Sequence, residues 1–190
     1  MKLYTIIGGV NGAGKSSLTG VLKNQLRDLG VIVDVDSITA KLGGSATQGG
    51  KTAIRLMEDC IARGVNFTQE TTLSGARTQQ TARKVKDAGY NIRMFYVGLD
   101  TQDECLKRIA NRVEKGGHDI PTQDVARRFA GRFEALAQVL PYCDEAVFFD
   151  NDNGFAQVAE YRNGEIIPLV EAHPRWLVEL LAAVGTGAQG

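Results

Sequence analysis

Residues 9–16 read Gly9-Val10-Asn11-Gly12-Ala13-Gly14-Lys15-Ser16, and this stretch decides the fold of the chain. It fits the pattern G-x-x-x-x-G-K-[ST], follows the compact apolar run 3–8, and precedes apolar residues at helical spacing. Glycines let successive backbone N–H groups converge on phosphate oxygens, and the N-terminus of the following helix adds partial positive charge. A plain glycine-rich turn does not need Lys and Ser at these positions. The stretch therefore predicts a phosphate-binding loop, or P-loop.

The P-loop also predicts which residues contact a nucleotide. We expect Lys15 to reach the β- and γ-phosphates of ATP and the Ser16 hydroxyl to bind Mg²⁺. ATP and Mg²⁺ are the cofactors that follow from this assignment. The predicted ATP-binding residues are Gly9, Asn11, Gly12, Ala13, Gly14, Lys15, Ser16 and Ser17.

The rest of the chain alternates short apolar runs with helical patterns. We expect a first helix over 15–29, with Gly30 just beyond its end. A loop that holds the glycines of 43–50 precedes a second helix from Ile54 to Gly64, and a third helix follows the third strand and ends at about residue 88. Two more helices are expected over 103–113 and 124–140. Strands are expected at 3–8, 31–35, 65–69, 92–99 and 146–149. Because these runs are almost continuously apolar, they indicate a parallel sheet that is buried on both faces.

The C-terminal part follows another pattern. Asn163-Gly164 is typical of a type I′ hairpin within 158–167, Trp176 lies in a final helical pattern, and residues 185–190 are expected to fray. We therefore predict an α/β fold, a three-layer P-loop NTPase of the nucleotide-kinase-like type. It has a mostly parallel five-stranded sheet, a helical lid, and a small C-terminal β-hairpin plus helix. Residues 1–190 are expected to form one domain, with a lid segment at 107–132 and a C-terminal appendage at 155–184.

Composition excludes several function classes. The 190 residues include 22 basic and 22 acidic side chains, so the chain lacks the broad positive field that nucleic acids and anionic membranes attract. No apolar run approaches the roughly 18 residues of a membrane span, and the N-terminus does not read as a signal peptide. Cys60, Cys105 and Cys143 have no metal-binding spacing. We expect a cytoplasmic protein without a nucleic-acid or membrane partner.

The lid segment is the basic part of this neutral chain. Residues 107–132 hold seven basic and three acidic side chains. Arg108 and Arg112 are four residues apart, as are Arg128 and Arg132, so each pair shares a helix face. Two basic faces joined at a glycine pair predict a lid that closes arginines over a triphosphate. His118 lies in this hinge and is expected to be exposed rather than catalytic.

Polar side chains follow the second and third expected strands. Asp36 ends the second run and is a candidate proton acceptor, although capping of the next helix would also explain it. Glu70, Thr71 and Thr72 end the third run, at the sheet edge where ligands bind in open α/β sheets. Glu70 could bind acceptor hydroxyls or hold Mg²⁺ through water, and the residues alone leave that choice open.

Other P-loop classes fit less well. The guanine-reading pattern N-K-x-D is absent from the chain. Residues 73–76 are similar to a shortened ABC signature, but only 56 residues separate Ser16 from Leu73. In addition, Thr101 follows Asp100 where an ABC ATPase has its hydrolytic glutamate.

From Leu3 to about Asn151, the chain resembles the zeta-toxin family, in the short subgroup often labelled predicted ABC-type ATPase. The motifs that carry the resemblance are Gly9 to Ser16, Asp34-x-Asp36, Phe67-x-x-Glu70-Thr71-Thr72-Leu73-Ser74-Gly75, Asn111-Arg112-Val113, Gly116-Gly117-His118-x-Ile120-Pro121 and Arg127-Arg128. The resemblance implies a kinase that phosphorylates a hydroxyl of UDP-N-acetylglucosamine, and it raises an antitoxin protein as a partner.

The same resemblance implies roles for individual residues. Asp36 would be the base, Lys15 and Ser16 the ATP–Mg²⁺ contacts, Glu70 an acceptor ligand, and Arg112 and Arg128 the catalytic lid arginines. Arg108, Arg127 and Arg132 compete for the lid positions. The chain is shorter than the full toxins, so their later sugar-contacting segments have no residue-by-residue match.

We therefore expect an ATP-dependent phosphotransferase that acts on a hydroxyl of a small molecule. A kinase for an antibiotic, a nucleoside or a sugar uses the same scaffold and is the alternative within enzymes. A nucleotide-dependent switch or interaction module with slow ATP hydrolysis is the alternative outside them, and an ATPase acting on nucleic acid ranks last because the basic excess is only local.

Overall fold

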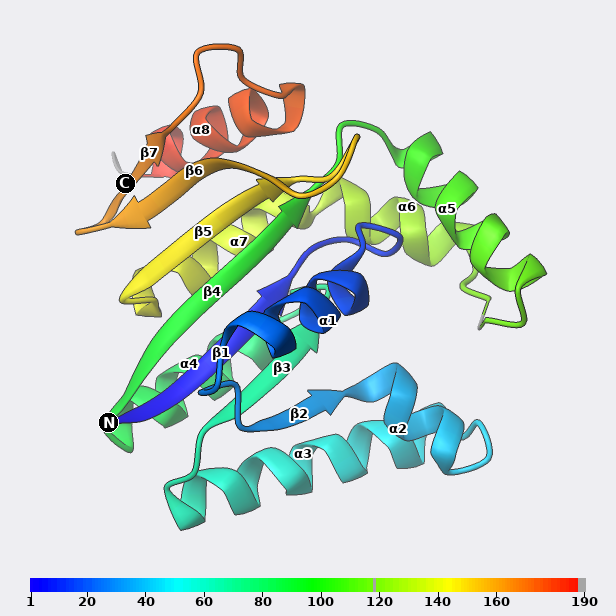
Figure 1. Ribbon diagram of the computed structural model, residues 1–190, viewed down its shortest axis with the longest axis vertical. Helices are drawn as coiled ribbons and strands as arrows, with labels where there is room; N and C mark the ends of the chain where they lie inside the picture. The colour runs from blue at the N-terminus through cyan, green and yellow to red at the C-terminus, as the bar shows by residue number, and fades with distance from the viewer. Residues whose placement is uncertain (118, 188–190) are drawn as a thin grey trace.

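The computed structural model describes residues 1–117 and 119–187, and its centre is one continuous sheet (Figure 1). The strand order is β2-β3-β1-β4-β5-β6-β7. Five strands are parallel: β1 (Lys2–Gly8), β2 (Val31–Asp34), β3 (Phe67–Thr71), β4 (Tyr90–Gly98) and β5 (Glu145–Asp150). The hairpin β6 (Ala156–Arg162) and β7 (Glu165–Pro168) is antiparallel. The predicted parallel strands are confirmed, with ends that differ by at most two residues.

The hairpin is part of the sheet rather than a separate addition. Its strand β6 pairs with β5, so the sheet has seven strands where five plus a hairpin were expected. Asn163 and Gly164 have φ of 54° and 87°, the left-handed values that a type I′ turn requires. This pairing satisfies the backbone groups that β5 would otherwise leave open at its edge.

Helices cover both faces of the sheet, which gives the predicted three layers. One apolar core joins the sheet to α3 (Ala46–Arg63), α4 (Arg77–Asp87), α7 (Arg132–Val139) and α8 (Arg175–Gly187). The second core joins the other face to α1 (Lys15–Gln25), α5 (Gln102–Glu114) and α6 (Thr122–Ala130). Neighbouring residues of β1 divide between them, since Ile6 belongs to the first core and Ile7 to the second. In Figure 1, α5 and α6 lie beyond the carboxyl ends of β1 and β4.

Several helix boundaries differ from the sequence expectation. Helix α1 ends at Gln25, well before Gly30. The expected glycine loop at 43–50 is wrong in its second half, because Ser45 caps α3 and Gly49 and Gly50 lie inside that helix. An additional short helix, α2 (Val35–Lys41), follows β2 directly. Apolar periodicity misses such starts where the first turn of a helix is polar or small.

The helix expected over 124–140 is interrupted at Gly131. Helix α6 ends there, α7 begins at Arg132, and a 3₁₀ turn over Leu140–Tyr142 follows. At the C-terminus, α8 continues to Gly187, so fraying from residue 185 is wrong for 185–187, while 188–190 lie outside the described residues.

Helix α8 is anchored by Trp176, which is fully buried. Its indole Nε1 donates to Asp150 Oδ1 at 2.8 Å, and its backbone N donates to Asp100 Oδ1 at 2.9 Å. Asp100, which the ABC alternative would use at its catalytic strand, thus satisfies the first turn of a helix. Within the described part of the chain, no helix has the length and apolarity that crossing a membrane requires.

Candidate functional site

The P-loop connects β1 to α1 through three glycines with positive φ, and two of them, Gly9 and Gly12, also lie against backbone of other elements. Gly9 has φ of 149°, and a Cβ there would lie 2.5 Å from the Val97 carbonyl oxygen of β4. Gly12 has φ of 77°, and a Cβ there would lie 2.7 Å from the Cys105 carbonyl oxygen of α5. Both contacts are with backbone, which cannot move aside. The two glycines therefore let the loop lie directly against β4 and α5.

Lys15 lies across the P-loop. Its Nζ donates to the carbonyl oxygens of Gly9 at 2.9 Å and Val10 at 3.0 Å. Burial of the ammonium lowers the pKa of Lys15 to about 8, and the carboxylates of Glu70, Asp36 and Asp34 oppose part of that shift. A cation held this way beside a phosphate-binding loop can neutralise a bound triphosphate.

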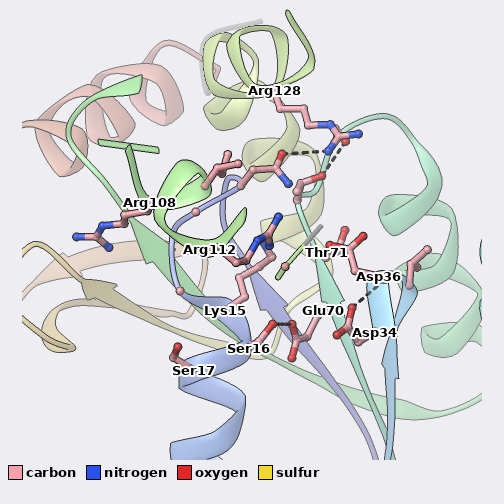
Figure 2. A pocket seen from close by; sticks show the side chains of 18 of the residues that line it. Lys15, Ser16, Ser17, Asp34, Asp36, Glu70, Thr71, Arg108, Arg112 and Arg128 are labelled. Atoms are coloured by element: carbon pink, nitrogen blue, oxygen red, sulfur yellow. Dashed lines mark hydrogen bonds between the residues drawn. The ribbon is translucent and has the colours of Figure 1, made fainter. Parts of the chain in front are cut away.

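Glu70 lies next to the predicted metal ligand. Ser16 Oγ donates to Glu70 Oε2 at 2.8 Å (Figure 2). Thr19 Oγ1 donates to Glu70 Oε1 at 2.5 Å. The Glu70 side chain is buried, and β3 places it beside Ile7 of β1 and Asp34 of β2. A hydroxyl and a carboxylate at this position fit Mg²⁺, which binds oxygen donors and keeps several water or phosphate ligands.

The expectation that Asp36 ends the strand or caps the next helix is wrong, because Asp34 takes both places. The strand ends at Asp34, whose Oδ1 accepts from the Asp36 backbone N at 3.0 Å. Asp34 is therefore the N-cap of α2, and Asp36 lies in the first helical turn rather than at the strand end or the cap. Both carboxylates line the same cavity as Lys15 (Figure 2).

The β3–α4 connection presents hydroxyl groups to the cavity. Thr71 Oγ1 and Thr78 Oγ1 are 3.2 Å apart, and Thr72 Oγ1 and Ser74 Oγ are 2.9 Å apart. Leu73, which lies between Thr72 and Ser74, is buried and has φ of 60°. This left-handed value costs a leucine roughly 1–2 kcal/mol. The buried leucine fixes this turn, so Thr71 and Thr72 reach the cavity from a defined backbone.

The structure separates the competing arginines of the lid segment. Arg108, Arg112 and Arg128 line the cavity. Arg132 instead pairs with Glu179 at 2.6 Å and packs over the rings of Phe129 and Phe133. Arg127 pairs with Asp124 at 2.7 Å on the exposed side of α6. The expectation for His118 lies outside the described residues.

Three hydrogen bonds connect the lid segment, the β5–β6 loop and the P-loop. Arg128 Nη1 donates to Asn11 Oδ1 at 3.0 Å (Figure 2). Arg108 Nη2 donates to the Asn151 carbonyl oxygen at 2.6 Å, and Asn151 Nδ2 donates to the Ala13 carbonyl oxygen at 2.7 Å. The carboxyl ends of β1 and β5 thus meet the lid segment at one place.

These elements enclose one cavity of about 860 Å³. Its volume is in the range of small-molecule sites. The cationic side chains of its lining outnumber the carboxylates: Lys15, Arg77, Arg108, Arg112, Lys115 and Arg128 against Asp34, Asp36 and Glu70. The cavity can therefore hold a polyanion close to carboxylates in one space.

The cavity lining includes residues that no sequence pattern had predicted, among them Arg77 and Asn151. Arg77 begins α4, and among the described residues no hydrogen bond or ion pair involves it. Asn151 follows β5, so the rule that ligand-binding residues follow strand ends could have identified it. No comparable signal marks Arg77.

The structural comparisons agree on the class of fold. The structure described for the PezAT chromosomal toxin-antitoxin system of Streptococcus pneumoniae matches with a TM-score of 0.68 at 15% identity, over 100% of this chain and 88% of that chain. The crystal structure of AvrRxo1-ORF1:-ORF2 with ATP matches with a TM-score of 0.67 at 14% identity, over 98% of this chain and 76% of that chain. The protein therefore has the same P-loop fold as these two structures, which confirms the predicted resemblance at the level of the fold.

Comparison of sequences finds a relative that matches only part of this chain. An uncharacterized protein of Haemophilus influenzae is 29% identical over 126 residues, which are 64% of this chain and 88% of that protein. A scan against protein-family models finds no match.

Proposed function

We propose that this protein transfers the γ-phosphate of ATP to a hydroxyl group of a small molecule. The observation that carries the proposal is the shared cavity, where a P-loop, two aspartates of the β2–α2 junction and three arginines of the lid segment face one space. The P-loop fold and its likeness to a structure containing ATP support ATP as the donor.

The nucleotide end would work by charge neutralisation. The N–H groups of the P-loop and the Lys15 ammonium bind the triphosphate, while Arg112 and Arg128 approach the transferring phosphoryl group from the lid segment. Ser16 and Glu70 would hold Mg²⁺, Glu70 through water, and the bound metal would add positive charge at the phosphates. Holding these groups in place matters more than covalent chemistry, because the phosphoryl transition state is loose.

Asp36 is the proposed proton acceptor. Its carboxylate is exposed to the cavity, whereas the Asp34 carboxylate accepts a backbone hydrogen bond and caps α2. The cap role of Asp34 survives replacement by Asn, since both side chains cap helices equally well. Asp34→Asn is therefore the matched control for Asp36→Asn.

The pair of variants tests the assignment of the base. We expect Asp36→Asn to lose acceptor phosphorylation by about 10²–10⁴-fold while ATP affinity stays within a few-fold of wild type. Asp34→Asn should retain most activity. Equal activity of Asp36→Asn and wild type would remove Asp36 from the mechanism, and the reverse ranking would make Asp34 the base.

UDP-N-acetylglucosamine is the first acceptor to test, on the resemblance of the motifs. ADP formation in Mg-ATP would be measured with and without this acceptor, beside a Lys15→Ala control. ADP that depends on the acceptor and disappears in the control is the expected result. If this acceptor changes nothing, nucleosides, sugars and antibiotics follow, and slow turnover with all of them favours the switch alternative.

We further propose an antitoxin protein as partner and the cytoplasm as the location. The partner follows from the toxin-antitoxin system among the structural neighbours, and the location follows from ATP as donor. Expression of the wild-type chain alone should slow growth, and expression of Lys15→Ala should not. Equal growth of both strains would contradict a toxic role.

A further inference from the structure

One hydrogen bond joins the P-loop to the lid segment across 117 positions of the sequence. Arg128 Nη1 of α6 donates to the side-chain oxygen of Asn11 at 3.0 Å. Asn11 is only 6% exposed, so its side chain has little freedom to turn away. The Arg128 Nε is also buried, and no hydrogen-bond partner for it exists among the described residues. Asn11 is therefore the contact that orients this guanidinium.

Two neighbouring arginines of the lid segment, Arg127 and Arg132, have carboxylate partners instead of an amide. Arg127 is paired with the Asp124 carboxylate at 2.7 Å, and Arg132 with the Glu179 carboxylate at 2.6 Å. A carboxylate orients an arginine but also cancels its charge. The neutral amide of Asn11 orients Arg128 and leaves its full positive charge for a ligand.

The two helices of the lid segment reach the P-loop by different means. Helix α5 packs backbone against backbone, at Gly12 and Cys105, so its distance from the loop is fixed by close packing. Helix α6 follows the connection 115–121, and its cavity-lining arginine contacts the P-loop through Asn11. A long arginine side chain loses about 2 kcal/mol of rotamer entropy when it is ordered. The Asn11 contact orders the Arg128 side chain before the nucleotide binds, so this rotamer entropy is not lost in the binding step.

We infer that Asn11 is a positioning residue that pre-orients Arg128 toward the transferring phosphoryl group without neutralising it. This inference rests on the proposed function and replaces the sequence expectation that Asn11 contacts ATP itself. In this view Arg128 acts on the phosphoryl group, and Asn11 acts only through Arg128.

Two substitutions at Asn11 separate orientation from charge. Asn11→Ala removes the acceptor and should lower kcat by about tenfold, with the KM for ATP changed less than about twofold. Asn11→Asp keeps the hydrogen bond but adds a negative charge, and it should lower kcat at least as much. If the contact only held the P-loop and α6 together, Asn11→Asp would retain activity, because the new carboxylate would form an ion pair with Arg128 that preserves or strengthens this connection. Full activity of Asn11→Asp therefore overturns the inference.

A double-mutant cycle tests whether Asn11 acts through Arg128. In an Arg128→Ala background, Asn11→Ala should change kcat by less than about twofold. Asn151→Ala is the matched control, because Asn151 also bonds the P-loop but has no hydrogen bond to Arg128 among the described residues. Its effect should be the same in both backgrounds. A tenfold loss from Asn11→Ala in both backgrounds, or a rise in the KM for ATP alone, contradicts the inference and restores direct ATP contact.

The same cycle can be run without any acceptor. Mg-ADP with aluminium fluoride mimics the transferring phosphoryl group, and its dissociation constant reports the Arg128 contact directly. Failure of turnover with every acceptor would contradict the proposed function, while this binding cycle would still decide the role of Asn11. Thermal unfolding midpoints identify any variant that does not fold, and Asn11→Ser then replaces Asn11→Ala.

Discussion

The two ends of the cavity differ in how their side chains are held. At the nucleotide end, Lys15 bonds two P-loop carbonyls, Ser16 bonds Glu70, and Asn11 bonds Arg128. We call the cavity wall from Thr71 to Arg77 the acceptor end, because the proposed function assigns it to the acceptor. There the Thr72 and Ser74 hydroxyls bond one another, and the Arg77 side chain has no hydrogen bond or ion pair among the described residues.

This difference shows how a fold can separate a constant task from a variable one. Triphosphate binding needs a fixed array of donors, and the hydrogen bonds of the nucleotide end hold that array in place beforehand. Acceptor binding depends on the shape and charge of one molecule, and the acceptor end leaves its cation and hydroxyls available for it. The following predictions test whether the division holds.

Lys15→Ala should produce the largest effect. Loss of the ammonium removes charge that every acceptor reaction needs, so ADP formation should fall by about 10³-fold with any acceptor. Lys23→Ala is the matched control, because Lys23 is an exposed lysine of the same helix. A loss that depends on the acceptor chosen would contradict assignment of Lys15 to the nucleotide end. Initial rates of ADP release provide the measurement.

Glu70→Gln should reduce turnover by about 10²-fold and raise the Mg²⁺ concentration needed for half-maximal rate, because the amide retains one oxygen but loses the charge. A Mg²⁺ titration at saturating ATP measures this shift. If instead the Mg²⁺ dependence is unchanged and the KM for the acceptor rises, Glu70 belongs to the acceptor end, as the family resemblance implies. This variant therefore sharpens the boundary between the two ends.

Arg77→Gln should affect only the acceptor end. For an anionic acceptor, we expect the KM to rise by about tenfold, with the KM for ATP unchanged. Arg83→Gln on the same helix, exposed and away from the cavity lining, serves as the control. Steady-state kinetics at varied acceptor concentration distinguish the two variants. A change in the KM for ATP would show that Arg77 works at the nucleotide end.

The smallest expected effect concerns pH. Because the pKa of Lys15 lies near 8 in the folded protein, kcat/KM for ATP should decrease above about pH 8 as the ammonium loses its proton. The ordinary value is 10.5, so between about pH 8 and 10.5 the unfolded chain binds more protons, and this group makes unfolding less favourable as pH rises. As pH rises above about 8, kcat/KM for ATP should therefore fall while the contribution of Lys15 to the free energy of unfolding rises. A parallel decrease of both would contradict the assignment.

Local patterns in the sequence were sufficient to predict the five parallel strands and the P-loop. The run from Gly9 to Ser16 specifies strand, loop and helix within one segment, and its chemistry needs no distant partner. The apolar strands could be located because burial on both faces leaves few polar residues in them. Helix starts were harder to predict. After its N-cap Ser45, α3 begins with small and polar residues that show no apolar periodicity.

The acceptor end and the choice of arginines were decided by the tertiary structure. Asp34 rather than Asp36 caps α2 because the strand ends one residue earlier than its apolar pattern suggested. Arg128 faces the cavity and Arg132 does not, although they are four residues apart, because Gly131 breaks the helix between them. Spacing predicts a shared face only while one helix continues.

Sequence patterns were therefore enough to predict the P-loop and the five parallel strands, because each depends on residues within a short segment. Only the tertiary structure decided which side chains from distant segments meet. Examples are Glu70 with Ser16, Asn151 with Ala13, and Arg128 with Asn11. The physical reason is that these contacts depend on strand register and helix breaks, which set positions in space that no local pattern encodes.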